Sequence, residues 1–134
     1  MLGDSDAVAT LAVKDLEAAK KFYEDKLGLK MDLSKSKDEG DPGGVMYSSG
    51  NSKVFVYQSS FAGTNQATAC SWGVGENIEK VVEGLKAKGV SFEHYDNLPG
   101  TKLEGDIHII EMANLKAAWF KDPDGNILNI VNKM

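Results

Sequence analysis

Apolar and polar positions alternate along the chain at two spacings, and these spacings follow one another in the same order twice. Residues 7–13 form a short apolar run rich in small and β-branched side chains, which predicts a strand. Asp15 then stands where a helix N-cap is expected, and Gly28 stands where a left-handed residue would end that helix. The apolar stripe of the predicted helix consists of Leu16, Ala19, Tyr23 and Leu27.

The first half of the chain continues with three more predicted strands, at residues 30–34, 45–49 and 53–58. The last two flank a Ser-Gly-Asn-Ser turn, which predicts a hairpin. Residues 35–44 follow the first of these strands and are polar and rich in glycine, so we expect a loop there.

The second half repeats this order of elements. Residues 67–74 and 90–95 predict strands, and the segment between them predicts a helix with Asn77 as a possible N-cap and Gly89 at its end. The apolar stripe of this helix consists of Ile78, Val81, Val82 and Leu85. A long loop that contains residues 97–100 then leads to the last hairpin.

That last hairpin closes on Asp122-Pro123-Asp124-Gly125. Asp122 can accept backbone N–H groups of its own turn, Pro123 fixes φ at its position, and Gly125 supplies the positive φ that follows a type I turn. Turn geometry therefore explains both aspartates, and we do not expect them to bind a metal or to act as acid and base.

Local similarity between the two halves supports an internal repeat. Residues 13–17 correspond to residues 74–79, and residues 50–56 correspond to residues 125–131. The sequence therefore predicts an α+β protein built from two β-α-β-β-β units. The alternative is an unrelated α+β protein in which the similarity between the two halves arose by chance.

The two predicted units cover about residues 7–58 and 67–132. One unit alone would leave a face of its sheet uncovered, so we expect the two to pair into a single domain over residues 1–134. The length of 134 residues, with 42% hydrophobic and 26% charged residues, suits one globular domain.

Charge and cysteine content narrow the possible partners and location. The net charge of −5 and the scattered lysines argue against nucleic acid and membrane surfaces as partners. No stretch approaches the roughly 18 apolar residues of a membrane span, and residues 1–6 contain no signal-peptide pattern. Cys70 is the only cysteine, so no internal disulfide can form, which predicts a reducing, cytoplasmic location.

Two segments resemble a known family. Residues 13–23, running into Leu27-Gly28-Leu29, resemble the first unit of the vicinal oxygen chelate superfamily, and residues 119–126 resemble its closing motif. This superfamily includes glyoxalase I, bleomycin and fosfomycin resistance proteins and extradiol dioxygenases. The resemblance covers nearly the whole chain and implies two βαβββ modules that pair into a cup-shaped mixed sheet with the helices outside. It leaves the activity open, because the superfamily spans isomerases, epimerases, dioxygenases, thiol transferases and non-catalytic drug binders.

The resemblance also places the family's metal-binding positions. Its enzymes hold a divalent cation with four His, Glu or Gln side chains inside the cup. Here these positions correspond to Val8, Val54, Ala69 (or its neighbour Thr68) and Asn129. Valine and alanine supply no donor atom, and a single asparagine carbonyl binds a metal weakly. We therefore predict no metal and no cofactor, and the sequence identifies no catalytic residue.

Strand alternation predicts the lining of the cup when Val8 faces inward. The other inward positions are then Thr10, Ala12, Ser52, Val54, Val56, Gln58, Ile127, Asn129 and Val131. Thr10, Gln58 and Asn129 are the polar points of a largely apolar surface, which suits a small organic molecule. Trp72 and Tyr95 could add stacking surface, and His108 is expected near the rim. Trp72 and His108 therefore join the candidate ligand-binding residues.

Three functions follow from these observations. The first is a metal-free binding protein of the glyoxalase/bleomycin-resistance type, which the resemblance suggests is a homodimer. The second is a lyase, isomerase or dioxygenase with no metal or with a non-standard site built from His108, Glu111 and a neighbour. The third is a structural or partner-binding protein with a filled cup. We expect His94 and Cys70 to have structural roles.

Overall fold

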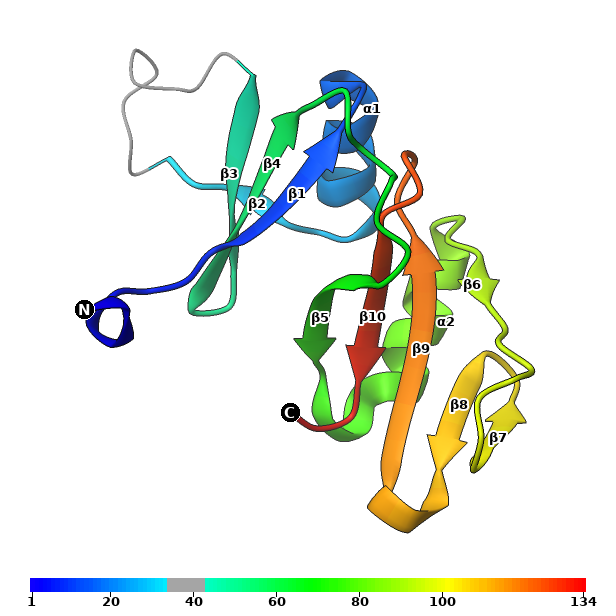
Figure 1. The fold of residues 1–134 in the computed structure, drawn as a ribbon. Helices are drawn as coiled ribbons and strands as arrows, with labels where there is room; N and C mark the ends of the chain where they lie inside the picture. Colours follow the sequence, from blue (N-terminus) through cyan, green and yellow to red (C-terminus); the bar gives the residue numbers. More distant parts are fainter. Residues whose placement is uncertain (34–42) are drawn as a thin grey trace.

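The structure, a computed structural model, describes residues 1–33 and 43–134. It contains two mixed sheets, each with one helix lying on one of its faces (Figure 1). Ser34, the predicted end of one strand, and residues 35–42 of the predicted loop lie outside the described residues.

The elements of the two sheets follow the same order. The first set is β1 (Ala9–Val13), α1 (Leu16–Lys20), a π-helical continuation (Lys21–Lys26), β2 (Lys30–Met31), β3 (Gly44–Ser49) and β4 (Ser52–Gln58). The second set is β5 (Thr68–Gly73), α2 (Ile78–Ala87), β6 (Phe92–Glu93), β7 (Thr101–Glu104), β8 (Ile107–Ile110), β9 (Leu115–Lys121) and β10 (Ile127–Val131). Short 3-10 turns cover Leu2–Asp4, Gly75–Asn77 and Glu111–Ala113.

Both sheets place their first strand parallel to their last. The strand orders are β1-β4-β3-β2 and β5-β10-β9-β8-β7, and β6 also pairs with β9. The predicted α+β class with a repeated order of elements is therefore confirmed. The two sheets are separate rather than one continuous cup-shaped sheet, because β1 and β5 approach each other without strand pairing in the described residues.

A hairpin of β7 and β8 occupies the segment where the sequence reading expected a long loop. Gly105, with φ of +61°, supplies the left-handed residue at its turn. This hairpin extends the second sheet by pairing β8 with β9. The second unit is therefore larger than the first.

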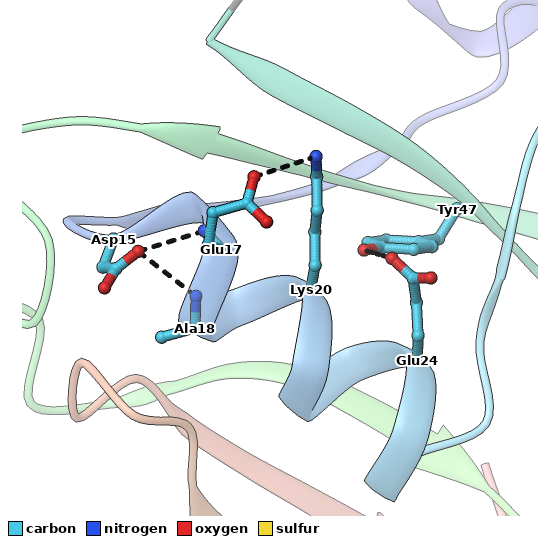
Figure 2. A network of polar contacts seen from close by, with 6 residues as sticks. All are labelled: Asp15, Glu17, Ala18, Lys20, Glu24 and Tyr47. Atoms are coloured by element: carbon cyan, nitrogen blue, oxygen red, sulfur yellow. Dashed lines mark hydrogen bonds and ion pairs between the residues drawn. The ribbon is translucent and has the colours of Figure 1, made fainter.

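The helices begin and end as the sequence predicts, with one exception. The Asp15 carboxylate accepts the backbone N–H groups of Glu17 and Ala18, at 3.0 and 3.2 Å, and so caps α1 (Figure 2). Gly28 and Gly89 both have positive φ. Asn77 precedes α2, but its side chain makes no capping hydrogen bond. No helix in residues 1–33 and 43–134 is long and apolar enough to cross a membrane.

The register of β1 and β4 decides which face of the first sheet is buried. Leu11 lies opposite Val56, and Val54 and Val56 are only 2% and 1% exposed in the core that also contains helix residues. Gln58 lies opposite Val13, on that same face. The prediction that Val54, Val56 and Gln58 face the cup is therefore wrong, because an offset of one residue reverses every side chain of a strand.

The open face of β4 instead carries two aromatic side chains. Phe55 and Tyr57 stack with their ring centroids 5.9 Å apart. They lie opposite Thr10 and Ala12 of β1, which the sequence reading placed correctly on the face away from the core. The first sheet thus has an aliphatic face toward α1 and a half-buried aromatic face away from it.

The closing turn makes two polar contacts with the first unit. The Tyr23 hydroxyl of the first unit donates to Asp122 Oδ2 of the closing turn at 2.7 Å. Asn126 Nδ2, in the same turn, donates to the Ala12 carbonyl of β1 at 2.7 Å. Burial and the Asp122 carboxylate raise the pKa of Tyr23 well above its usual value, so its hydroxyl remains a donor. The DPDG turn therefore binds both the helix and the first strand of the other unit.

A second hydrogen bond ties the helical segment to the first sheet. The Tyr47 hydroxyl on β3 donates to the Glu24 carboxylate at 2.7 Å, as Figure 2 shows. Tyr23 and Tyr47 stack with centroids 6.3 Å apart, so the two phenols lie side by side and point at different carboxylates.

We predict that Tyr23→Phe lowers the free energy of unfolding by about 1–3 kcal/mol, because it leaves a buried carboxylate one donor short. Tyr57→Phe is the matched control, since the Tyr57 hydroxyl has no hydrogen-bond partner in the described chain. Urea unfolding followed by circular dichroism measures both variants. Equal stability of the two variants would show that the Tyr23–Asp122 contact does not hold the units together.

Candidate ligand-binding site

Three side chains share the face of the second sheet that points away from α2. The β9–β10 register places Asn129 opposite Trp119, and the β8–β9 register places His108 opposite Ala117, two residues before Trp119. Leu128 and Ile130 alternate with Asn129 and belong to the core. Asn129, Trp119 and His108 therefore lie on three adjacent strands, β10, β9 and β8.

Asn129 is buried with an unused acceptor. Its side chain is 7% exposed, and its Oδ1 has no hydrogen-bond partner among the residues that the structure describes. The neighbouring Trp119 is half-buried and orients its indole by donating from Nε1 to Thr68 Oγ1 at 3.1 Å. A buried acceptor without a donor costs about 1–3 kcal/mol, so this carbonyl favours any ligand that offers it an N–H or O–H group.

His108 is buried with an unused donor. Its Nε2 accepts the Tyr95 backbone N–H at 2.9 Å, so in the neutral ring the proton is on Nδ1. Nδ1 has no partner of hydrogen-bond geometry, although the Ala117 backbone lies near it. Burial, and then the nearby His94, lower the pKa of His108, so the ring is neutral at pH 7.

An aromatic cluster covers His108. The ring of Trp119 lies edge-on to His108 with centroids 5.1 Å apart, and the Tyr95 ring lies 5.8 Å from His108 and 5.5 Å from Trp119. Trp119 thus lies between two buried polar atoms, His108 Nδ1 and Asn129 Oδ1, that have no hydrogen-bond partner in the described residues.

The segment that carries Tyr95 is fixed at its base. His94 Nε2 and Lys86 Nζ both contact Asp106, each at 2.7 Å, so the turn between β7 and β8 is tied to α2. Hydrogen bonds from Lys86 and then from His94 lower the pKa of Asp106. His94 therefore has the structural role that the sequence predicts, as a surface contact that supports the Tyr95 cover.

Of the five predicted ligand-binding residues, only His108 and Asn129 come together. Thr10 lies on the open face of the first sheet and donates to the Val8 carbonyl. Gln58 donates to the Lys14 carbonyl, and Trp72 lies opposite Ile130 on the core side and donates to Ser49 Oγ. These three residues make contacts of their own away from the face that carries Asn129.

Trp119 and Tyr95 are the members of the site that sequence reasoning missed or treated as secondary. A hairpin closed by residues 122–125 pairs Lys121 with Ile127 and therefore Trp119 with Asn129. The turn alone could have identified Trp119 as the neighbour of Asn129. Tyr95 had no such signal, because its position depends on the unforeseen β7–β8 hairpin.

The side chains at the family's metal-binding positions do not fit a divalent cation. Val8 and Ala69 have no donor atom, and Val54 points into the core. In the described residues, no group of three or more His, Cys, Asp or Glu side chains could hold a metal. Glu111 is exposed in the turn after β8, so the alternative site with His108 also lacks its third ligand there.

The chain belongs to the glyoxalase/bleomycin resistance protein/dioxygenase superfamily, whose family model matches residues 6–130. No match was found among curated protein sequences. The fold is shared with solved structures of low sequence identity, which support the architecture alone.

Three of these structures illustrate the range. The glyoxalase family protein from Enterococcus faecalis is 20% identical, with a TM-score of 0.68 and coverage of 98% of this chain and 99% of that one. The bleomycin resistance determinant encoded on transposon Tn5 is 16% identical, with a TM-score of 0.66 and coverage of 96% and 98%. The lactoylglutathione lyase from Agrobacterium tumefaciens is 18% identical, with a TM-score of 0.64 and coverage of 96% and 92%.

We predict that the protein loses stability as pH falls below about 6.5. In the unfolded chain His108 takes up a proton in that range, whereas the folded state resists it because burial lowers the pKa of this ring. His108→Gln should flatten this part of the profile of unfolding free energy against pH. Identical slopes for wild type and H108Q between about pH 6.5 and 5 would contradict the assignment.

Proposed function

We propose that this protein binds a small, largely apolar organic molecule on the His108–Trp119–Asn129 face, without a metal. One observation carries the proposal. Two buried polar atoms, an imidazole N–H donor and an amide carbonyl acceptor, lack partners on either side of an indole. Buried polar groups in folded proteins are almost always paired, so these two atoms are best explained as partners of a ligand.

The chemistry of the site defines the class of ligand. His108 is neutral at pH 7 because its pKa is lowered, and Asn129 carries no charge, so neither attracts an ion. His108 and Asn129 lie two strands apart, which is about 10 Å across the sheet. The ligand is therefore a flat, neutral molecule of about two fused rings with an acceptor at one end and a donor at the other.

We propose that the protein acts as a homodimer. The aromatic face of the first sheet, with Phe55, Tyr57 and Met46 half-buried, has no covering helix or strand among residues 1–33 and 43–134, and Val8 at its edge is 38% exposed. In a homodimer this face could close over the ligand face of the second copy, which would enclose the ligand between two aromatic surfaces. A lone, half-buried Cys70 is consistent with our assignment to the cytoplasm.

A metal-free lyase or isomerase of the same superfamily is the second candidate. The Nδ1–H of His108 could donate a proton or a hydrogen bond to a substrate carbonyl, because its Nε2 is already held by the Tyr95 N–H. The two functions can be distinguished by whether the bound compound is chemically changed. An enzyme converts a carbonyl compound that sits on this face, and a carrier returns it unchanged.

The predicted ligand class can be tested with 6-acetyl-2-naphthol, which has a carbonyl at one end and a hydroxyl at the other. We expect a saturable shift of the Trp119 indole N–H signal in ¹⁵N NMR spectra, with the Trp72 signal unchanged because that indole lies on the core side. Trp72→Phe assigns the two signals. Asn129→Leu should weaken binding about tenfold, the effect of one lost hydrogen bond in a buried site.

The matched ligand is 2-acetylnaphthalene, which has the same shape without the hydroxyl. Wild type should prefer the naphthol, and the Asn129→Leu variant should bind both compounds equally. A shift of the Trp72 signal instead of the Trp119 signal would rule out this face as the ligand site. If neither compound causes a saturable shift, the proposed ligand class is wrong.

A further inference from the structure

A groove of about 410 Å³ lies at the seam between the two units. The helical segment of the first unit forms one wall through Phe22 and Lys26, and the second unit forms the other through residues 89–91, Glu93 and residues 121–123. Figure 1 shows the closing turn of β9 and β10 reaching toward the helical segment of the first unit. The Tyr23 hydroxyl of that segment donates to Asp122 of the turn. A molecule in this groove would touch both units.

The floor of the groove is apolar and fixed. Phe22 and Val90 are each 6% exposed, and Phe22 packs against Phe120 with centroids 6.4 Å apart. The π-helical segment, in which the Leu27 N–H donates to the Phe22 carbonyl, carries Phe22 and Lys26 four residues apart on the same side. π-Helical turns of this kind are often found at functional sites.

Most charged groups of the groove are already paired. Lys121 and Glu93 form an ion pair at 3.2 Å. The Asp122 carboxylate accepts from the Tyr23 hydroxyl, from Asn126 Nδ2 and from the backbone N–H groups of Asp124 and Asn126. The Asp122 carboxylate therefore has no capacity left for a cationic ligand, and the charge of Glu93 is offset by Lys121.

Lys26 is the charged group of the groove that is not paired. Its half-buried ammonium has no hydrogen-bond or ion-pair partner in the described chain. Gly89 lies directly beside the ammonium, since a Cβ on that residue would be in van der Waals contact with Lys26 Nζ at 3.6 Å. The hydroxyl of Ser91 is also without a partner there. The groups of the groove that remain available to a ligand are therefore mainly hydrogen-bond donors.

We propose that this seam groove binds a compact organic anion, a carboxylate on an aromatic or alicyclic body. The carboxylate would take the Lys26 ammonium and the Ser91 hydroxyl as donors, and its ring would lie on Phe22 and Val90. What distinguishes this position is that the Lys26 ammonium lies beside an apolar floor formed by Phe22 and Val90.

Lys26 could instead act only on α2, which ends immediately before Gly89. A cation near the C-terminus of a helix is favourable without any ligand. The two roles make different predictions, because a purely structural lysine affects stability and leaves anion binding unchanged. The test therefore measures binding with neutral and charged forms of one ring system.

The experiment titrates the full chain with 2-naphthoate and follows backbone amide signals by ¹⁵N NMR. We expect saturable shifts at Gly89, Val90 and Ser91, and at least tenfold weaker binding of 2-naphthylmethanol, the neutral analogue. Lys26→Met should reduce 2-naphthoate affinity about tenfold, and Lys26→Arg should retain it. Lys80→Met is the control, since Lys80 is exposed on α2 and lies outside the groove.

Three results would overturn the proposal. They are the absence of saturable shifts at residues 89–91 up to about 10 mM 2-naphthoate, equal affinity for the neutral alcohol, and unchanged affinity in folded Lys26→Met. The wild-type comparison of anion and alcohol needs no variant, so the test holds even if a substitution perturbs folding. Trp119 does not line the groove, so its indole signal reports the His108–Trp119–Asn129 site and separates the outcomes at the two sites.

Discussion

The buried carboxylate of Asp122 holds the two halves of this protein together. It gathers four hydrogen bonds at the point where the closing turn of the second unit meets the helix of the first. Three of them fix the turn itself and the fourth, from Tyr23, crosses the seam. A charged group can be buried in this way only when its oxygens are fully used. The turn geometry and the relative position of the two units therefore depend on one another.

That constraint also sets the geometry of the ligand face. The turn at residues 122–125 fixes the register of β9 and β10, and that register brings Trp119 beside Asn129. The β7–β8 hairpin then adds His108 on the next strand, under the Tyr95 ring. An unpaired donor and an unpaired acceptor on this face distinguish it from the core face, where apolar side chains fill the same positions.

The closing turn, the helix caps and the repeat could be predicted from the sequence because each rests on residues that are close along the chain. Asp15 and Gly28 were correctly placed for this reason. The faces of β4 were not, since the repeat alone could not decide between Val54 and Phe55 for the open face. The pairing of β4 with β1 decides which side chains of β4 are buried, and an offset of one residue along β4 places the core side chains on the open face.

In the candidate site, too, the residues fixed by local sequence could be predicted and those fixed by long-range contacts could not. Asn129 was found from its distance to the turn, and its partner Trp119 follows from hairpin register. His108 was expected near the rim and lies instead fully buried, because Tyr95 covers it from a segment whose position depends on Asp106 in a distant turn. Trp72, an attractive stacking residue in the sequence, belongs to the opposite face.

The central claim is that a neutral ligand bridges His108 and Asn129 without a metal. The most direct measurement is the ¹⁵N–¹H NMR signal of the His108 imidazole in protein treated with EDTA, with and without 6-acetyl-2-naphthol. The account predicts a ring protonated on Nδ1 in both states, and a downfield shift of that N–H when the ligand accepts its hydrogen bond. An unchanged His108 signal at saturating ligand, or binding that appears only when a divalent metal is restored, would contradict it.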